Sequence, residues 1–486
     1  MSKLRAVFCL LLLTLPALAQ TPPPPAPRPR LPADVTTHHS LDLPGRTLAF
    51  AATAGSMTLN DAAGAPQAAI AFVAYTRDDP APAARPVTFV LNGGPGASSA
   101  WLQLGLAGPW RIPMTPDAAR PSASATPLSN ADTWLDHTDL VFLDPIGTGF
   151  SRLLTDKEDA RKKYWSVNGD IDSLAEVIRR WLQANHRMTS PKFLLGESYG
   201  GFRGPRLARA LASEQGVGLN GLILVSPVLD FGGNSNAYNP LSWVYALPSA
   251  VATIRDRSAP VSRAGMADVE AYAAGDYLVD LLRGDRDEAA VARRIARISV
   301  LTGLDPVLLT RRRGMPNNAE FLRESNHVAI GSFYDATVTA ADPYPHGANS
   351  YPPDAMTEAL YAPVTSAMLE LYTNRLNWVP DGTYTLNNPA VNRAWDWGAG
   401  NNRPESLGAL RTAVALDPQL HVLIAHGFFD FVTPYFRTKL MLDPIPASAG
   451  ADRIALEVYP GGHMFYSRDA SRAAFRARAL DIYQGK

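Results

Sequence analysis

Six short apolar segments, each bounded by turn-forming residues, constrain the fold of this chain more than any other feature of its sequence. They occupy residues 87–92, 139–144, 192–197, 221–226, 421–426 and 454–459. Apolar runs of this length are typical of strands buried in a parallel sheet. Helical patterns lie between them, the clearest at 171–182, where apolar residues recur every three or four positions. The alternation of strand and helix predicts an α/β fold with a mostly parallel central sheet flanked by helices.

Two segments depart from this alternation. Residues 39–77 alternate apolar and polar side chains around turn signals, which predicts an antiparallel β-meander at the start of the fold. Residues 230–403 show helical periodicity, for example at Val269, Tyr272, Leu278 and Leu282, and predict a helical insertion. We therefore assign 39–229 and 404–486 to the two parts of the core and 230–403 to a cap.

The N-terminal residues 1–19 have the features of a secretory signal peptide, with Lys3 and Arg5 before an apolar run and small residues at the end. Residues 20–38 follow as a proline-rich linker. The apolar run is shorter than the about 20 residues that span a bilayer, so we expect cleavage and no stable membrane insertion afterwards. Cys9 is the only cysteine and would be removed, which leaves no disulfide and suits a bacterial protein that is periplasmic or secreted.

The charge balance argues against two classes of partner. The chain has 45 basic and 45 acidic residues, so no net field favours a nucleic acid or an anionic membrane. Without a cysteine in the mature chain, thiol catalysis and cysteine-built zinc sites are excluded as well.

A candidate nucleophile lies at Ser198, in the segment Gly-Glu-Ser-Tyr-Gly at 196–200. The segment fits the G-x-S-x-G pattern, and it follows an expected strand and precedes a helix-like stretch at 205–212. That is the context of a nucleophile elbow, a sharp turn that exposes the serine hydroxyl at the edge of the sheet. Such a serine needs a base to take its proton and a carboxylate to orient that base.

Asp430 and His463 are the candidate acid and base. Each follows one of the two last expected strands by a short loop, and the chain order serine, acid, histidine is the one found with this elbow. Taken singly, Asp430 could be a turn residue and His463 a hydrogen-bonded loop histidine. His421 and His426 are weaker candidates because they flank an apolar run.

Oxyanion stabilisation requires backbone N–H donors, one of them from an early strand-to-helix loop. The sequence Leu-Asn-Gly-Gly-Pro-Gly at 91–96 supplies such a loop directly after the first strong strand. Its glycines allow the backbone to approach a substrate closely, although a plain Gly-Pro turn would have the same composition.

Five motifs in order resemble the serine carboxypeptidase family, whose members have the α/β-hydrolase fold. They are the segments 92–96, 144–151 and 196–200, the loop of Asp430, and Gly-His-Met at 462–464. The resemblance runs from about residue 85 to 470 and includes a helical insertion between the elbow and the acid. It implies Ser198, Asp430 and His463 as catalytic triad and the backbone N–H groups of Gly94 and Tyr199 as oxyanion hole.

The resemblance also implies that Asn92 and Glu197 bind the C-terminal carboxylate of a substrate. Because like charges repel, Glu197 would have to share a proton with that carboxylate, which favours binding in acid. One departure stands out, since Leu106 occupies the position where the family usually has a second glutamate. Arg203 and Arg206 could compensate with positive charge, although surface arginines are the simpler interpretation.

The sequence therefore predicts a serine-type peptidase, most simply a carboxypeptidase acting on peptides or proteins without a cofactor or a metal. Two alternatives stay open: an esterase or aminopeptidase with the same triad, and a non-catalytic binding module on the same fold. Side-chain specificity, natural substrate and oligomeric state have no signature in the sequence.

Overall fold

The computed structural model describes residues 30–78, 81–232, 239–326, 329–346, 353–398 and 404–485. The expected signal peptide at 1–19 lies outside these residues, as does the first part of the expected linker. Strand β1 (Val35–Leu43) already begins within the range assigned to that linker. Among the described helices, none is both long and apolar enough to cross a membrane.

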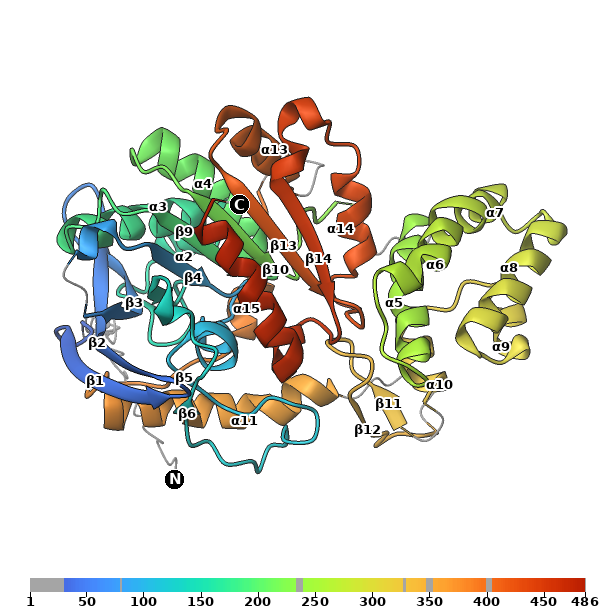
Figure 1. Ribbon diagram of the computed structural model, residues 1–486, viewed down its shortest axis with the longest axis horizontal. Helices are drawn as coiled ribbons and strands as arrows, with labels where there is room; N and C mark the ends of the chain where they lie inside the picture. The colour runs from blue at the N-terminus through green and yellow to red at the C-terminus, as the bar shows by residue number, and fades with distance from the viewer. Residues whose placement is uncertain are drawn as a thin grey trace, which may run out of the picture.

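A single large sheet forms the centre of the molecule (Figure 1). Its strands follow the order β1-β2-β3-β7-β4-β9-β10-β13-β14. From β7 onward the neighbours pair in parallel, whereas β1, β2 and β3 form an antiparallel meander. The bounds of the other strands are β2 Arg46–Asn60, β3 Pro66–Arg77, β4 Val87–Leu91, β7 Asp139–Leu143, β9 Lys192–Glu197, β10 Gly221–Val225, β13 His421–Gly427 and β14 Ile454–Tyr459. This is the α/β-hydrolase fold, and the prediction of an α/β fold with a mostly parallel sheet is confirmed.

The register of the parallel strands aligns their carboxyl ends. Leu91 of β4 lies opposite Gly196 of β9, and Glu197 lies opposite Val225 of β10. On the other side, Gly427 of β13 pairs with Tyr459 of β14. The loops that follow these strands therefore meet at one edge of the sheet, where α/β folds carry their ligand sites.

Alternating side chains of the strands fill two separate cores. Leu194 and Leu222 face a cluster that includes helices α3 (Val167–Ala184), α4 (Tyr199–Glu214) and α13 (Leu407–Leu416). Leu195 and Ile223 face the opposite cluster, with α11 (Ala355–Glu370) and α15 (Asp469–Tyr483). Since every residue of β9 and β10 is buried, these strands read as continuous apolar runs in the sequence. Strand β14 is the exception, because it is an edge strand and only half-buried.

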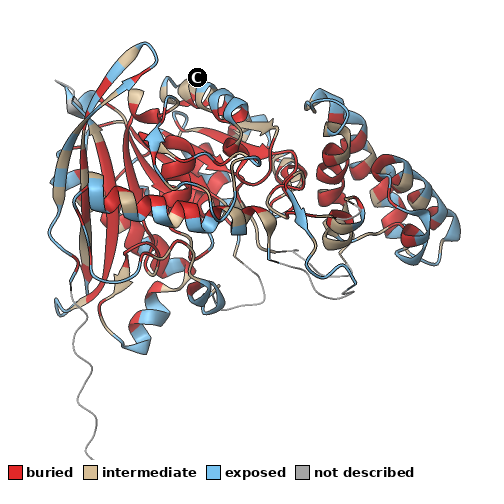
Figure 2. Cartoon of the chain, turned by 90° about the horizontal axis from the view of Figure 1, so that it is seen from below, coloured by how far each residue is buried: buried red, intermediate tan, exposed pale blue. Residues whose placement is uncertain are grey.

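A group of helices projects from one end of the sheet (Figure 1). It consists of α5 (Leu241–Asp256), α6 (Ala267–Tyr272), α7 (Leu278–Arg283), α8 (Glu288–Thr302), α9 (Pro306–Arg311) and α10 (Asn318–Glu324). These helices share their own apolar cluster, while Figure 2 shows exposed residues along their outer faces. Leu282, part of the helical periodicity in the sequence, lies in α7 and is exposed.

Helix α11 behaves differently from the projecting helices. It falls in the range 230–403 that we assign to the cap, yet its apolar residues belong to a core of the sheet. The boundaries of the insertion stay a prediction.

Candidate active site

Ser198 sits at a sharp turn between β9 and α4. Its backbone has φ +60° and ψ −118°, a strained conformation that residues other than glycine rarely adopt. The turn is held because Ser198 N–H donates to the Val225 carbonyl of the neighbouring strand at 2.9 Å. The side chain is half-exposed, whereas its neighbours Glu197 and Tyr199 are buried. The predicted elbow geometry is present.

Asp430 lies in the loop after β13 and is completely buried. Its Oδ1 accepts the backbone N–H groups of Val432 at 2.7 Å and Thr433 at 2.9 Å. Its Oδ2 accepts the Thr433 hydroxyl at 2.6 Å and lies 2.9 Å from His463 Nδ1. An ionised carboxylate can only accept, so the shared proton resides on Nδ1 and leaves Nε2 of the imidazole as an acceptor.

His463 is held from several sides in the loop after β14. Its backbone N–H donates to the Tyr334 carbonyl at 2.5 Å, and its carbonyl accepts the Ser226 hydroxyl at 2.8 Å. The ring of Tyr334 meets the imidazole edge-on, with centroids 5.3 Å apart. These contacts come from two segments that are distant in the chain, so the orientation of the ring depends on the tertiary fold.

The two groups shift each other's ionisation. Burial alone would raise the pKa of Asp430, but the charge of His463 and hydrogen bonds from His463 and Thr433 outweigh it and hold the pKa below its usual value. For His463, burial opposes the charged form, yet the charge and hydrogen bond of Asp430, helped by Glu197, raise its pKa. The pair is thus built to stabilise an imidazolium.

Ser198 and His463 line the same cavity, of about 830 Å³. In the part of the chain that the structure describes, no hydrogen bond joins Ser198 Oγ to His463. Catalytic hydrogen bonds in free enzymes are often long and tighten only when substrate binds. Asp430 lies behind the histidine and does not reach the cavity, which is the arrangement a triad requires.

The glycine loop at 92–96 packs directly against the elbow. A Cβ on Gly93 would lie 2.5 Å from the Tyr199 nitrogen, and Gly94 has φ +101°, so both positions require glycine. Gly94 lines the cavity. Tyr199 is the first residue of α4, where backbone N–H groups have no partner within the helix. Its side chain packs away from the cavity, against Phe202, so only its backbone can serve as a donor.

Asn92 and Glu197 also line the cavity, and the structure joins them. Asn92 Nδ2 donates to Glu197 Oε2 at 3.1 Å, while Asn92 Oδ1 accepts the Leu102 N–H at 3.1 Å. The Tyr466 hydroxyl donates to the same Oε2 at 2.7 Å. Burial raises the pKa of Glu197 although the charge of His463 and these two hydrogen bonds oppose the shift. A carboxyl group that favours its proton therefore lies next to Ser198.

Three further residues named from the sequence lie away from the cavity. Leu106 is fully buried in the apolar core. Arg203 is not a surface arginine: it is completely buried, pairs with Asp170 and donates to the Asn92 carbonyl. Arg206 donates to the Glu405 carbonyl, and neither guanidinium reaches the cavity. Their charge does not replace a second glutamate, because burial beside Asp170 commits Arg203 to a structural role.

The weaker histidine candidates do not line the cavity either. His426 is completely buried and its Nδ1 lies 3.1 Å from the Thr433 carbonyl. Burial lowers its pKa to about 4, so it is neutral over the ordinary pH range. Within the described ranges, no group of three or more His, Cys, Asp and Glu side chains is arranged to hold a metal ion.

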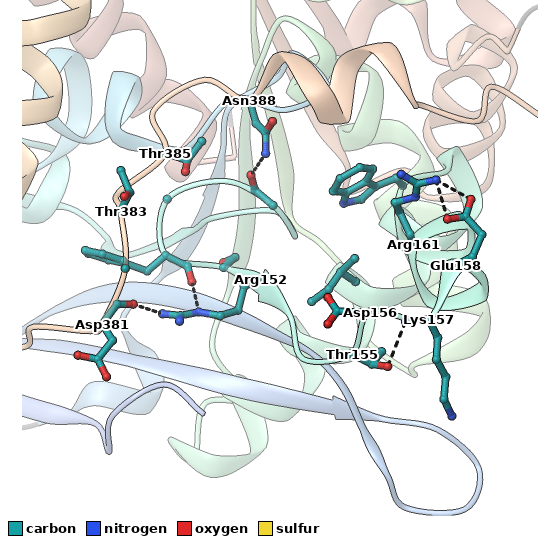
Figure 3. A pocket seen from close by; sticks show the side chains of 17 residues that line it. Arg152, Thr155, Asp156, Lys157, Glu158, Arg161, Asp381, Thr383, Thr385 and Asn388 are labelled. Carbon is teal, nitrogen blue, oxygen red and sulfur yellow. Dashed lines mark hydrogen bonds and ion pairs between the residues drawn. The ribbon is translucent and has the colours of Figure 1, made fainter. Parts of the chain in front are cut away.

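A second cavity, of about 530 Å³, adjoins the first across Asn388, which lines both (Figure 3). Two of its basic side chains have partners within the protein. Arg161 pairs with Glu158 at 2.6 Å, and Arg152 donates to the Asp381 carbonyl at 2.8 Å. The groups able to perform chemistry are gathered in the cavity of Ser198.

Sequence reasoning missed three residues of this site. Thr433 bonds both Asp430 and His463, Tyr466 bonds Glu197, and Tyr334 packs on His463. Thr433 has a weak signal, because an aspartate that accepts N–H groups two and three residues later is typical of a turn. The other two contacts join segments far apart in the chain and leave no local pattern.

The comparison with protein families gives a match to the serine carboxypeptidase model over residues 44–257. This part of the chain, less than half of its length, is similar to the serine carboxypeptidase family. The resemblance inferred from the motifs is thereby confirmed. Ser198, Asn92 and Glu197 fall inside the match, whereas Asp430 and His463 lie beyond it and rest on geometry.

Two of the curated relatives are named as carboxypeptidases or carboxypeptidase-like proteins. Serine carboxypeptidase-like 45 of Arabidopsis thaliana is 28% identical over 221 residues, which cover 43% of this chain and 43% of the relative. A pheromone-processing carboxypeptidase of Yarrowia lipolytica is 30% identical over 166 residues, 34% of this chain and 25% of the relative. The chain thus covers less than half the length of each of these two relatives.

Among solved structures, the match with the proline iminopeptidase of Mycobacterium smegmatis covers 89% of this chain and 98% of the chain of that protein. The identity is 15% and the TM-score 0.39, too low to add to the fold described above.

Proposed function

We propose that the protein is a serine-type carboxypeptidase, which hydrolyses peptide bonds through an acyl-enzyme and releases C-terminal residues. The observation that carries the proposal is that one cavity holds two sets of groups. Ser198 and His463 fit acyl transfer, and the buried carboxyl of Glu197 with Asn92 fits recognition of a carboxylate. The family match at 44–257 supports the same activity.

The chemistry would proceed in two stages. Ser198 Oγ attacks the scissile carbonyl while His463 Nε2 takes its proton, and Asp430 stabilises the imidazolium through Nδ1. The imidazolium then protonates the leaving amine, which departs with the C-terminal residue. Water, activated by the same imidazole, attacks the acyl-enzyme and frees Ser198.

Negative charge develops on the carbonyl oxygen in both stages. We assign its stabilisation to the backbone N–H groups of Gly94 and Tyr199, which come from the glycine loop and the start of α4. The loop and the elbow are in contact through Gly93, so both donors are supplied by rigid, close-packed backbone. The positive end of the α4 dipole adds to the effect.

The substrate carboxylate would bind Glu197 and Asn92. The amide of Asn92 has two N–H donors, and one is used by Glu197 Oε2, which leaves the other for the substrate. Glu197 must be neutral to approach a carboxylate, and its raised pKa extends the pH range in which it is. Asn92 and Glu197 lie beside the nucleophile, so a C-terminal residue would place its peptide bond at Ser198.

We further propose that the core consists of 39–229 and 404–486, and that the insertion 230–403 forms one wall of the substrate cavity. Tyr334, Tyr361 and Asn388 of the insertion line it. Side-chain specificity would then depend on this wall rather than on the triad.

The test uses one peptide with a free and with an amidated C-terminus, followed by mass spectrometry from about pH 4 to pH 8, a range that brackets ordinary and raised carboxyl pKa values. We expect stepwise loss of C-terminal residues from the free peptide alone, strongest in acid, and no turnover by Ser198→Ala. Equal cleavage of both peptides would mean that Asn92 and Glu197 do not recognise the substrate carboxylate. The protein would then be an endopeptidase, aminopeptidase or esterase. Full activity of Ser198→Ala would reject the nucleophile.

A further inference from the structure

Tyr466 contacts the carboxyl group of Glu197 from within the protein. Its hydroxyl is completely buried and donates to Glu197 Oε2 at 2.7 Å. Burial, together with the negative charge of Glu197, raises the pKa of Tyr466 well above its usual value, so the phenol keeps its proton at any working pH. Tyr466 is thus a permanent donor to Glu197.

The fold makes room for this contact by leaving a glycine opposite the ring. Tyr466 belongs to the short turn Phe465–Ser467, three residues after His463. A Cβ on Gly105 would lie 2.6 Å from Tyr466 Cε2 and 2.8 Å from Met114 Sδ. Since the Gly105 position has no side chain, the tyrosine ring can lie close enough for its hydroxyl to reach Glu197.

Both internal donors of Glu197 end on the same oxygen. Asn92 Nδ2 and the Tyr466 hydroxyl each bond Oε2, and neither bonds Oε1. Glu197 lines the cavity, so the orientation of its carboxyl plane decides which oxygen can meet a ligand. Fixing Oε2 from two directions leaves Oε1 as the oxygen that faces a substrate.

Among the described residues, no second acid bonds Glu197, and Glu358, the other acid that lines the cavity, is exposed. The segment that carries Gly105 continues with Leu106, which is buried in the apolar core and absent from the cavity wall. The hydrogen-bond partners of Glu197 are a neutral phenol and a neutral amide, and the charges that act on it are those of His463 and Asp430.

We infer that Tyr466 is a positioning residue for substrate recognition: it holds Glu197 so that a single carboxylic acid binds the free C-terminus of the peptide. The inference rests on the proposed carboxypeptidase function and names the device that sets its pH range. With one acid, binding of the C-terminal carboxylate depends on one proton, so log kcat/KM falls with a limiting slope of about −1 above the optimum.

Tyr466→Phe tests the inference through the pH profile of kcat/KM on a free peptide. The hydrogen bond from Tyr466 favours the charged form of Glu197, so the pKa of Glu197 rises in the variant. The falling limb of the profile, where kcat/KM decreases with pH, therefore moves to higher pH. In acid, where Glu197 is neutral in both proteins, the variant loses about three- to tenfold in kcat/KM because Glu197 is less well positioned. Turnover of an ester that lacks a carboxylate stays within about twofold, since Ser198 and His463 are untouched.

Tyr277→Phe is the matched control. Its hydroxyl is equally buried and donates to the Gly314 carbonyl at 3.1 Å, among the projecting helices. We expect its pH profile to keep the wild-type shape. If Tyr466→Phe fails to fold, Gly105→Ala displaces the same ring while the hydroxyl stays in the chain, and the falling limb should move in the same direction.

Two outcomes separate this inference from the proposed function. If the wild type prefers free over amidated peptides but the falling limb stays in place in Tyr466→Phe or Gly105→Ala, the role of Tyr466 is rejected and the carboxypeptidase stands. A limiting slope of about −2 would also reject it, because a second acid would then share the site. If the wild type shows no such preference, the proposed function itself fails.

Discussion

Asp430 and Glu197 are two buried carboxyl groups that affect the same histidine, and their pKa values shift in opposite directions. Asp430 is completely buried and Glu197 is 3% exposed, so burial does not distinguish them. The pKa of Asp430 lies below its usual value and that of Glu197 above. Two acids of the same site are thus set for different protonation states.

The charge of His463 lowers the pKa of both groups, and the hydrogen-bond donors around them differ. Asp430 uses both oxygens, which accept the Val432 and Thr433 N–H groups, the Thr433 hydroxyl and the His463 ring. Glu197 accepts two donors, both on Oε2, and meets the charge of His463 without a hydrogen bond to it. Nearby charges and hydrogen-bond donors together set the charge of a carboxyl group when burial is equal.

Asp430→Asn should lower activity more than any other change to these two carboxyl groups. The amide cannot stabilise an imidazolium and favours the wrong histidine tautomer, so we expect kcat to fall about 10⁴-fold on peptide and ester alike. The measurement is steady-state turnover with active-site titration of Ser198. A loss below about tenfold would mean that Asp430 does not serve His463.

Thr433→Val removes one donor from Asp430 while keeping the shape of the side chain. The Thr433 hydroxyl lies 2.6 Å from Asp430 Oδ2 and 3.1 Å from His463 Nδ1, and its loss should raise the pKa of Asp430. We expect kcat to fall about tenfold, the value of one hydrogen bond to a charged group, with KM unchanged. Thr433→Ser restores the hydroxyl and should recover activity. A lowered kcat in the serine variant as well would point to packing instead.

Glu197→Gln replaces the carboxyl group by an amide that does not titrate, and so tests whether Glu197 causes the acid preference. The amide oxygen can accept Asn92 and Tyr466 as Oε2 does, while the NH₂ group can donate to a substrate carboxylate at any pH. We expect the acid preference for free peptides to disappear, with kcat/KM in acid within about tenfold of the wild type. Glu358→Gln removes an exposed charge at the rim of the same cavity and should leave the profile unchanged. A persistent acid preference in Glu197→Gln would assign it to another group.

The same variant has a smaller effect on stability that needs no substrate. Because the folded state raises the pKa of Glu197, its contribution to stability is present in acid and is lost as the pH rises through the folded pKa. Glutamine has no charge to bury, so Glu197→Gln should gain in melting temperature relative to the wild type as the pH increases, by about 1–3 °C. Thermal unfolding at several pH values measures this, and an equal difference at all pH values would contradict it.

Local patterns predicted much of this protein. The strands at 192–197 and 454–459 have the predicted bounds, since turn residues border both apolar runs, although 192–197 is buried throughout and 454–459 is a half-buried edge strand. Ser198, Asp430 and His463 followed from their places after strands, because parallel strands bring their carboxyl ends to one edge. Leu282 lies in a helix as the periodicity predicts but is exposed, because helical periodicity does not say which apolar residues a projecting helix leaves exposed.

The sequence by itself determined the α/β fold, the elbow at Ser198 and the order of the candidate triad, because strand patterns, glycine turns and chain order are local properties. Only the tertiary structure decided that Arg203 is buried and that Thr433 bonds the Asp430–His463 pair. It also decided that the Tyr466 ring packs against Gly105 and donates its hydroxyl to Glu197. These contacts join residues that are distant in the chain. The pKa of a carboxyl group depends on all the groups around it, so the opposite shifts of Asp430 and Glu197 arise only once the chain is folded.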